Sequence, residues 1–172
     1  MEESLSRTLP KVEEREEEQQ QGQNLKKLAI IMRGLPGSGK SRWVDEFIGS
    51  QTLEVAMSIR SKGYFSTDSL FYVGDEYRFD TKRLAEFHQR NLSGFIHALS
   101  VSQPLVICDN TNMAYWELMA YEAAAKALGY QVRMVLMGEP RDPDHQVVCA
   151  KRNNHNVPLA QIQRMAKQFE AC

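Results

Sequence analysis

Eight residues near the start of the chain, GLPGSGKS, have the composition and spacing of a phosphate-binding loop. They match the pattern Gly-x-x-x-x-Gly-Lys-Ser (Walker A) in full. Gly37 and Gly39 allow the backbone to turn so that successive N–H groups point inward, toward an anion. A helix that follows the loop adds the positive end of its dipole. The alternative is a plain turn between a strand and a helix, and the complete motif favours the phosphate site.

Two side chains of this loop indicate which ligands it binds. Lys40 is expected to reach the β- and γ-phosphates of a bound nucleotide, and the hydroxyl of Ser41 is expected to hold Mg²⁺. ATP and Mg²⁺ are therefore the expected cofactors. The residues predicted to contact the nucleotide are Gly34, Leu35, Pro36, Gly37, Ser38, Gly39, Lys40 and Ser41.

Two aspartates follow predicted strands, at the edge where ligands bind in open α/β sheets. Asp109 follows PLVIC and is predicted to hold Mg²⁺ directly or through water. Asp68 follows GYFST and is predicted to act as the general base for an attacking hydroxyl. Either aspartate alone could instead cap a helix or close an Asx turn. Together with the upstream loop, both are expected to converge on the γ-phosphate.

Other polar residues are candidates for supporting roles. The segment DNTN, residues 109–112, either orients substrate or builds a turn. Arg152, between two helical segments, is predicted to close over the phosphates as a lid residue, with a surface arginine as the alternative. Lys151 and His155 are weaker candidates. His88 and His97 lie in a helical pattern and are expected to be structural.

The surrounding sequence alternates between short apolar runs and helical patterns. This alternation predicts an α/β fold of the P-loop NTPase kinase type, a parallel sheet of about four to five strands covered by helices on both faces. Strands are predicted at 28–33, 63–67, 104–108 and 132–137, and helices at 41–50, 81–99, 116–129, 142–153 and 157–170.

The composition divides the chain into two parts. The 172 residues are 42% hydrophobic and 25% charged with a net charge of −1, which is typical of a globular domain. Seven glutamates against three basic residues give residues 1–24 a net charge of −4, so the remaining chain carries +3. We predict a disordered acidic tail over 1–25, with a charged helix over 11–23 as the alternative, and one P-loop kinase-like domain over 26–172.

Other features of the sequence bear on the cellular location of the protein. No apolar run approaches the roughly 20 residues that span a bilayer, and the acidic N-terminus is unlike a secretory signal. The three cysteines show neither metal-site spacing nor a paired framework, which suits a reducing compartment. A cytoplasmic location without membrane contact is expected, and a nuclear location is an alternative.

Several motifs in order give the chain a family resemblance. IIMRGLPGSGKS, FSTDSLF, YRFD, VICDNTN, GYQVRMVLMGEP and KRNNHNVPLAQIQRMAKQFE resemble the P-loop kinase-like domain of the Nedd-four-binding-protein-two-like group, from about residue 28 to 170. This domain is related to the polynucleotide 5′-hydroxyl kinases. The resemblance implies ATP, Mg²⁺ and phosphoryl transfer to a hydroxyl, with Lys40, Ser41, Asp68 and Asp109 at the phosphate, metal and base positions and Arg152 in the lid.

One departure from the related kinases concerns the acceptor. Polynucleotide kinases usually carry an arginine three residues after the catalytic aspartate, where it holds the phosphate of the acceptor, and this chain has Phe71 at that position. The leading hypothesis is a kinase that acts on a nucleic-acid 5′-hydroxyl or a small hydroxyl compound. The rival is a nucleotide-binding interaction module with little or no transfer. A GTPase is disfavoured because the chain has no N-K-x-D sequence.

Overall fold

A four-stranded parallel sheet forms the centre of the computed structural model, which describes residues 27–171. The predicted acidic tail lies outside the described residues. The strand order is β2-β5-β1-β6 and every pairing within this sheet is parallel, which confirms the predicted fold class. The strands are β1 (Leu28–Arg33), β2 (Tyr64–Phe65), β5 (Leu105–Asp109) and β6 (Gln131–Leu136).

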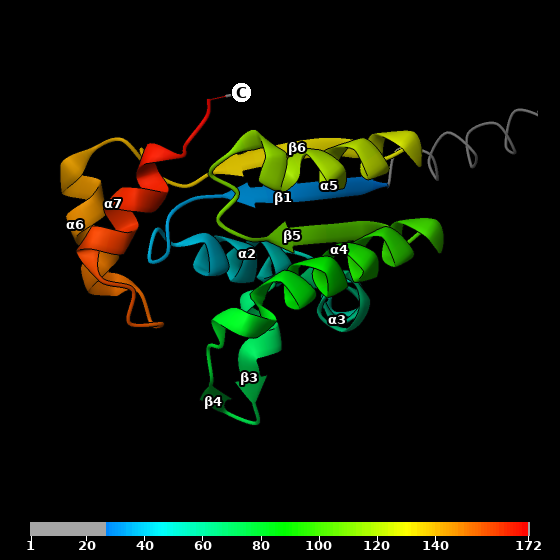
Figure 1. Ribbon diagram of the computed structural model, residues 1–172. Helices are drawn as coiled ribbons and strands as arrows, with labels where there is room; N and C mark the ends of the chain where they lie inside the picture. The colour runs from blue at the N-terminus through cyan, green and yellow to red at the C-terminus, as the bar shows by residue number, and fades with distance from the viewer. Residues whose placement is uncertain (1–26, 172) are drawn as a thin grey trace, which may run out of the picture.

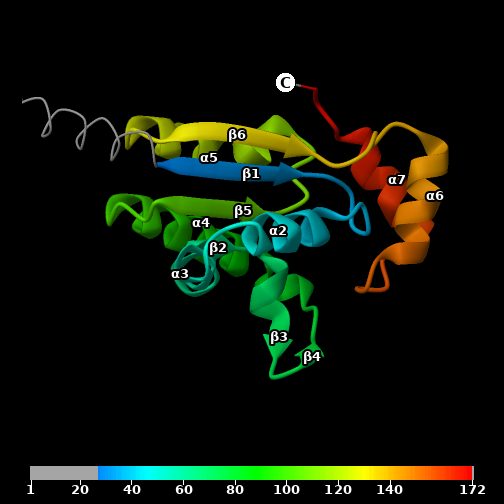
Figure 2. The same ribbon diagram turned by 180° about the vertical axis from the view of Figure 1, so that it is seen from behind.

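Helices cover both faces of this sheet (Figures 1 and 2). Successive side chains of a strand point to opposite faces, so β1 supplies Ala29 and Ile31 to one core and Ile30 and Met32 to the other. The first core is completed by α4 and α5, and the second by α2 and the α3 region. The bounds of these helices are α2 (Lys40–Gly49), α3 (Leu53–Ser58), α4 (Leu84–Ser100) and α5 (Tyr115–Ala127).

Two further helices form a separate pair beyond the carboxyl ends of β1 and β6 (Figure 1). They are α6 (Pro143–Arg152) and α7 (Leu159–Lys167). The side chain of Asp142 accepts a hydrogen bond from the backbone N–H of Asp144, so Asp142 is the N-cap of α6. Ile162 and Ala166 of α7 pack with Leu35 of the phosphate-binding loop, so this pair is attached directly to the loop.

A small hairpin projects from the sheet and was not predicted from the sequence (Figure 2). Its strands are β3 (Tyr72–Val73) and β4 (Glu76–Tyr77), joined through Gly74 at a φ of 62°. Phe71, which is 2% exposed, holds the hairpin against α4 by packing on Phe79 and Phe87, with ring centroids 5.0 and 4.6 Å away. The short helices Ile59–Gly63, Asp68–Phe71 and Thr81–Arg83 were also not predicted.

Two observations concern the cysteines and the expectation about membrane contact. Cys108 and Cys149 are both buried as free thiols. Within residues 27–171, none of the helices combines the length and the apolar character that a bilayer crossing requires.

Candidate functional site

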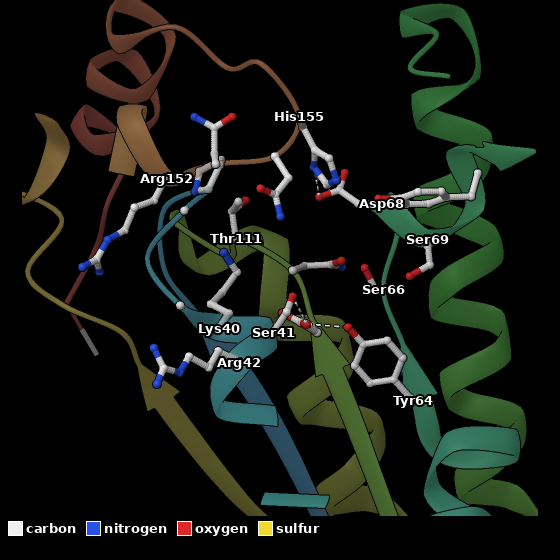
Figure 3. A pocket seen from close by; sticks show the side chains of 18 residues that line it. Lys40, Ser41, Arg42, Tyr64, Ser66, Asp68, Ser69, Thr111, Arg152 and His155 are labelled. Carbon is white, nitrogen blue, oxygen red and sulfur yellow. Dashed lines mark hydrogen bonds and ion pairs between the residues drawn. The ribbon is translucent and has the colours of Figure 1, made fainter. Parts of the chain in front are cut away.

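A pocket of about 610 Å³ opens at the carboxyl ends of the parallel strands, between the phosphate-binding loop, the hairpin and α6 (Figure 3). Its walls bring together side chains from segments far apart in the sequence. The residues that line it are Pro36, Gly37, Gly39, Lys40, Ser41, Arg42, Tyr64, Ser66, Asp68, Ser69, Tyr72, Asp109, Asn110, Thr111, Arg152, Asn153, Asn154 and His155.

The phosphate-binding loop has the backbone conformation that its glycines predict. Gly37 and Gly39 have φ values of 82° and 99°, a region that other residues rarely adopt. Gly39 is the N-cap of α2 and provides no side-chain cap, and the first turn of α2 has no acidic residue. The N-terminus of α2 is therefore available to an anion. The Ser38 hydroxyl is the one side-chain polar atom of the described residues that is buried without a hydrogen-bond partner, which also suits a loop that receives a ligand.

Lys40 lies across this loop. Its ammonium donates hydrogen bonds to the backbone carbonyls of Gly34 at 2.8 Å and Leu35 at 3.0 Å. Burial lowers the pKa of Lys40 below its usual value, and the negative charges of Asp109 and Asp68 partly oppose that shift. Removing solvent from an ammonium is unfavourable, so the site holds a positive charge that an anion would stabilise.

Asp109 is the meeting point of three elements. It is the last residue of β5 and only 5% exposed. Its Oδ2 atom accepts a hydrogen bond from the Ser41 hydroxyl at 3.1 Å and another from the Tyr64 hydroxyl at 2.5 Å. Burial and the charge of Asp109 raise the pKa of Tyr64, so the tyrosine remains a donor. Tyr64 was missed by the sequence analysis, although β2 pairs it with Ile107, two residues before Asp109.

The oxygen atoms of Ser41 and Asp109 have the chemistry that Mg²⁺ prefers. Across residues 27–171, no group of three or more His, Cys, Asp or Glu side chains is arranged to hold a metal ion. A site with few protein ligands suits Mg²⁺, which usually keeps water and binds substrate phosphates. Ser41 and Asp109 therefore fit the metal that the sequence predicted, as part of a site that phosphates would complete.

Asp68 faces the same pocket from its other side (Figure 3). It begins the short helix that follows β2, and its side chain is 52% exposed. His155, which was a weaker candidate in the sequence, places Nδ1 3.6 Å from Oδ2 of Asp68. The His155 ring stacks on Tyr77 of the hairpin with centroids 3.9 Å apart and planes inclined by 11°. His155 thus joins the connection between α6 and α7 to the hairpin, beside Asp68.

The DNTN segment lines the pocket through Asp109, Asn110 and Thr111 and also fixes the structure around it. Asn112 is 2% exposed with a φ of 48°, and its amide donates to the carbonyl of Met32 at 2.8 Å. Asn110 lines the pocket and accepts a hydrogen bond from the backbone N–H of Thr67 at 2.9 Å. Thr111 accepts one from the N–H of Gly34 at 3.0 Å. The segment therefore fixes the phosphate-binding loop and the Asp68 turn relative to β5.

Arg152 is the last residue of α6, within the helix predicted over 142–153. The lid candidate therefore lies at the end of the helix and not inside the connection between α6 and α7. The helical pattern persists to this residue because the turn begins at Asn153, whose amide donates to the carbonyls of Cys149, Ala150 and Val157. Arg152 lines the pocket and is exposed, and its guanidinium points away from Lys40 and Asp68 (Figure 3).

The end of α6 lies very close to the phosphate-binding loop. A Cβ atom at Gly37 would collide with the carbonyl oxygen of Cys149 and lie 2.8 Å from the backbone nitrogen of Asn153. Gly37 is thus required twice, for its φ and for this contact between loop and helix. The contact explains why a segment more than 110 residues later in the chain forms one wall of the pocket.

Comparisons with known proteins agree with this geometry. The model of a family described as the AAA domain matches residues 30–172. Human NEDD4-binding protein 2 is 34% identical over 146 residues, which make up 82% of this chain and 8% of that protein. A chain from the structure of the Pnkp1/Rnl/Hen1 RNA repair complex shares the fold, with a TM-score of 0.61 and 19% identity over 83% of this chain and 44% of that chain. The family resemblance expected from the motifs is confirmed.

Proposed function

The chain belongs to the AAA domain family, and on that basis we propose that it binds ATP with Mg²⁺ and transfers the γ-phosphate to a hydroxyl group. The observation that carries the proposal is the convergence of four side chains on one pocket. Lys40 and Ser41 approach from α2, Asp109 from the end of β5 and Asp68 from the turn after β2.

Each of these side chains has a role in the proposed transfer. The loop N–H groups and Lys40 bind the phosphates, while Ser41 and Asp109 hold Mg²⁺, which when bound neutralises charge on the phosphate oxygens. The acceptor oxygen attacks the γ-phosphorus and its proton passes to the carboxylate of Asp68. The bond from the γ-phosphorus to the β,γ-bridging oxygen breaks, and ADP leaves. Because Asp68 is half exposed, an acceptor can reach it from solvent.

A second function, a nucleotide-binding interaction module without transfer, is favoured by one observation. Phe71 is buried under the hairpin, so the position three residues after Asp68 offers no charge to an acceptor. The family match, the identity with NEDD4-binding protein 2 and the fold shared with a chain of an RNA repair complex support the enzyme instead. The two functions share ATP binding and differ in turnover.

Two measurements test the proposal. Isothermal titration of ATP with Mg²⁺ should show binding that Lys40→Ala weakens by about 100-fold or more, since the substitution removes the ammonium that lies across the phosphate loop. Arg60→Ala is a matched control, because Arg60 is exposed and pairs with Asp45. Equal ATP affinity for the wild type and Lys40→Ala would overturn the binding claim.

Transfer is tested with γ-labelled ATP against 5′-hydroxyl oligonucleotides and a panel of small hydroxyl compounds. Labelled product that depends on Asp68 supports the kinase. ATP binding without any labelled acceptor across both sets would favour the interaction module.

A further inference from the structure

The charged residues of the pocket are divided between its two sides. The basic side chains that line it, Lys40, Arg42 and Arg152, come from α2 and the end of α6 (Figure 3). The side chains around Asp68 come from β2, the turn after it, the hairpin and the connection between α6 and α7, and none of them is a lysine or an arginine. The basic group among them is the imidazole of His155, whose Nδ1 lies 3.6 Å from the Asp68 carboxylate itself. These acceptor-side residues are Tyr64, Ser66, Asp68, Ser69, Tyr72 and His155.

The hairpin beside Asp68 adds negative rather than positive charge. Residues 72–80 carry Asp75, Glu76 and Asp80 against one basic residue, Arg78. The guanidinium of Arg78 is held 2.8 Å from the carboxylate of Glu76. These hairpin carboxylates do not line the pocket, so their charge acts on it only from a distance. An acceptor that brings a phosphate to this side would meet the carboxylate of Asp68 and no lysine or arginine, which disfavours a phosphorylated acceptor.

The acceptor side of the pocket, around Asp68, also presents an aromatic ring. Tyr72 lines it and is 45% exposed. The Tyr72 ring lies 6.4 Å from the ring of His155, whose Nδ1 is 3.6 Å from Asp68. The neighbouring Tyr77 ring stacks on His155 and does not line the pocket. Of the other rings that line the pocket, Tyr64 is bonded to Asp109 and one face of His155 is covered by Tyr77, so Tyr72 is the exposed ring that a ligand at Asp68 would meet.

From this arrangement we infer that the acceptor is a nucleoside-like compound, recognised by stacking of its base on Tyr72 and carrying no phosphate. The inference rests on the proposed kinase function and specifies its substrate. The base lies on Tyr72, and a free sugar hydroxyl reaches Asp68. Its oxygen forms the new bond to the γ-phosphorus of ATP, its proton goes to the Asp68 carboxylate, and ADP is released. Stacking tolerates different bases, because every base presents an aromatic face.

The first arm of the test measures transfer. The four ribonucleosides and their 3′-monophosphates are supplied as acceptors with ATP and Mg²⁺, and kcat/KM is compared for each pair. We expect each nucleoside to equal or exceed its 3′-monophosphate. A preference of about tenfold or more for the 3′-monophosphates would overturn the inference and leave the kinase function standing.

The second arm measures binding without chemistry, which separates failure of the inference from failure of the kinase function. The full chain is saturated with a non-hydrolysable ATP analogue and Mg²⁺, and each nucleoside is titrated in. Tyr72→Ala should weaken nucleoside binding by about tenfold, since one stacked base is lost, while Tyr72→Phe should retain it. Nucleoside binding that depends on Tyr72 supports the acceptor site even if no transfer occurs. Absence of nucleoside binding, or binding unaffected by Tyr72→Ala, would overturn it.

Two further variants check the assignment. Tyr115→Ala removes a tyrosine of similar exposure on α5 that does not line the pocket, and it should leave nucleoside binding unchanged. Ser69→Arg places a cation on the acceptor side, so it should shift the ratio of affinities toward the 3′-monophosphates by about tenfold. An unchanged ratio in Ser69→Arg would contradict the claim that absence of a lysine or arginine on this side sets the preference.

Discussion

The hydroxyl of Ser41 donates a 3.1 Å hydrogen bond to Oδ2 of Asp109, which joins the phosphate-binding loop to the end of β5. The two residues are 68 positions apart, and the parallel pairing of β1 with β5 brings them together. Tyr64 donates to the same oxygen from β2. Neighbouring strands of the sheet thus fix the carboxylate in the position where Mg²⁺ and phosphate are expected.

Replacement of Asp109 by Asn tests the metal role. The amide has nearly the same shape but lacks the negative charge, so ATP affinity in the presence of Mg²⁺ should fall by about tenfold or more. Affinity for ATP in the presence of a chelator should change much less, because that state does not need the carboxylate. Titration calorimetry with and without Mg²⁺ measures both. Equal losses in the two conditions would show that Asp109 acts on the fold rather than on the metal.

Replacement of Asp68 by Asn separates binding from chemistry. The amide cannot accept the hydroxyl proton, so phosphoryl transfer should fall by about 100-fold or more while ATP affinity stays within a few-fold. Asp75→Asn is the control, because Asp75 is an exposed carboxylate of the adjacent hairpin that does not line the pocket. Wild-type turnover in Asp68→Asn would assign Asp68 to the turn that follows β2.

The lowered pKa of Lys40 predicts how ATP binding depends on pH. Binding needs the ammonium, so affinity should fall as the pH rises toward the lowered pKa, at a lower pH than an exposed lysine would show. The pKa values of Tyr64 and Tyr77 are raised by burial, so these groups keep their protons over the same range. Lys40→Arg keeps its charge and should bind with little alkaline dependence. An identical alkaline decline in Lys40→Arg would assign the titration to another group.

Alanine substitutions at two separate glycines test the contact between the phosphate-binding loop and α6. Gly37→Ala introduces a side chain at a φ of 82° and a collision with the Cys149 carbonyl, so the melting temperature should fall by at least about 5 °C. Gly49→Ala is the matched control, because Gly49 ends α2 and a Cβ there meets nothing within 4 Å. That variant should be neutral or slightly stabilised. Equal melting temperatures for the two variants would contradict the contact.

Sequence patterns predicted the parts of this molecule in which local and tertiary preferences agree. The apolar runs became the strands of the parallel sheet, since continuous hydrophobic segments favour burial on both faces. The loop motif predicted the convergence of Lys40, Ser41 and Asp109, because ligands collect at the carboxyl ends of parallel strands. The four strands of the sheet also lie within the range of four to five that these patterns predicted.

The hairpin and its contacts could not be predicted in this way. Its strands have two residues each, too short for a period to be recognised. Its attachment comes from Phe71, whose ring partner in α4, Phe87, lies 16 residues later in the chain. The stacking of Tyr77 on His155 joins segments that are 78 residues apart. Neither segment carries a local sequence pattern that predicts this contact. The site roles of Tyr64 and Tyr72 depend on such contacts, so they can be recognised only in the folded chain.

Replacement of Arg152 tests whether the α6–α7 pair acts as a lid. During transfer, negative charge on the equatorial γ-oxygens must be stabilised, and a guanidinium meets two oxygens at once where an ammonium cannot. Arg152 lines the pocket at the end of α6 with its guanidinium turned away from Lys40, so the role requires the side chain to rotate inward when ATP binds.

Arg152→Lys should therefore lose about tenfold or more in kcat although the charge is kept, and ATP affinity should fall less than kcat does. Arg164→Lys is the control, because Arg164 is an exposed arginine of α7 that bonds to Gln161 and does not line the pocket. Steady-state kinetics and titration of both variants measure the two constants. If Arg152→Lys and Arg164→Lys both turn over at the wild-type rate, Arg152 is a surface residue and the lid role is wrong.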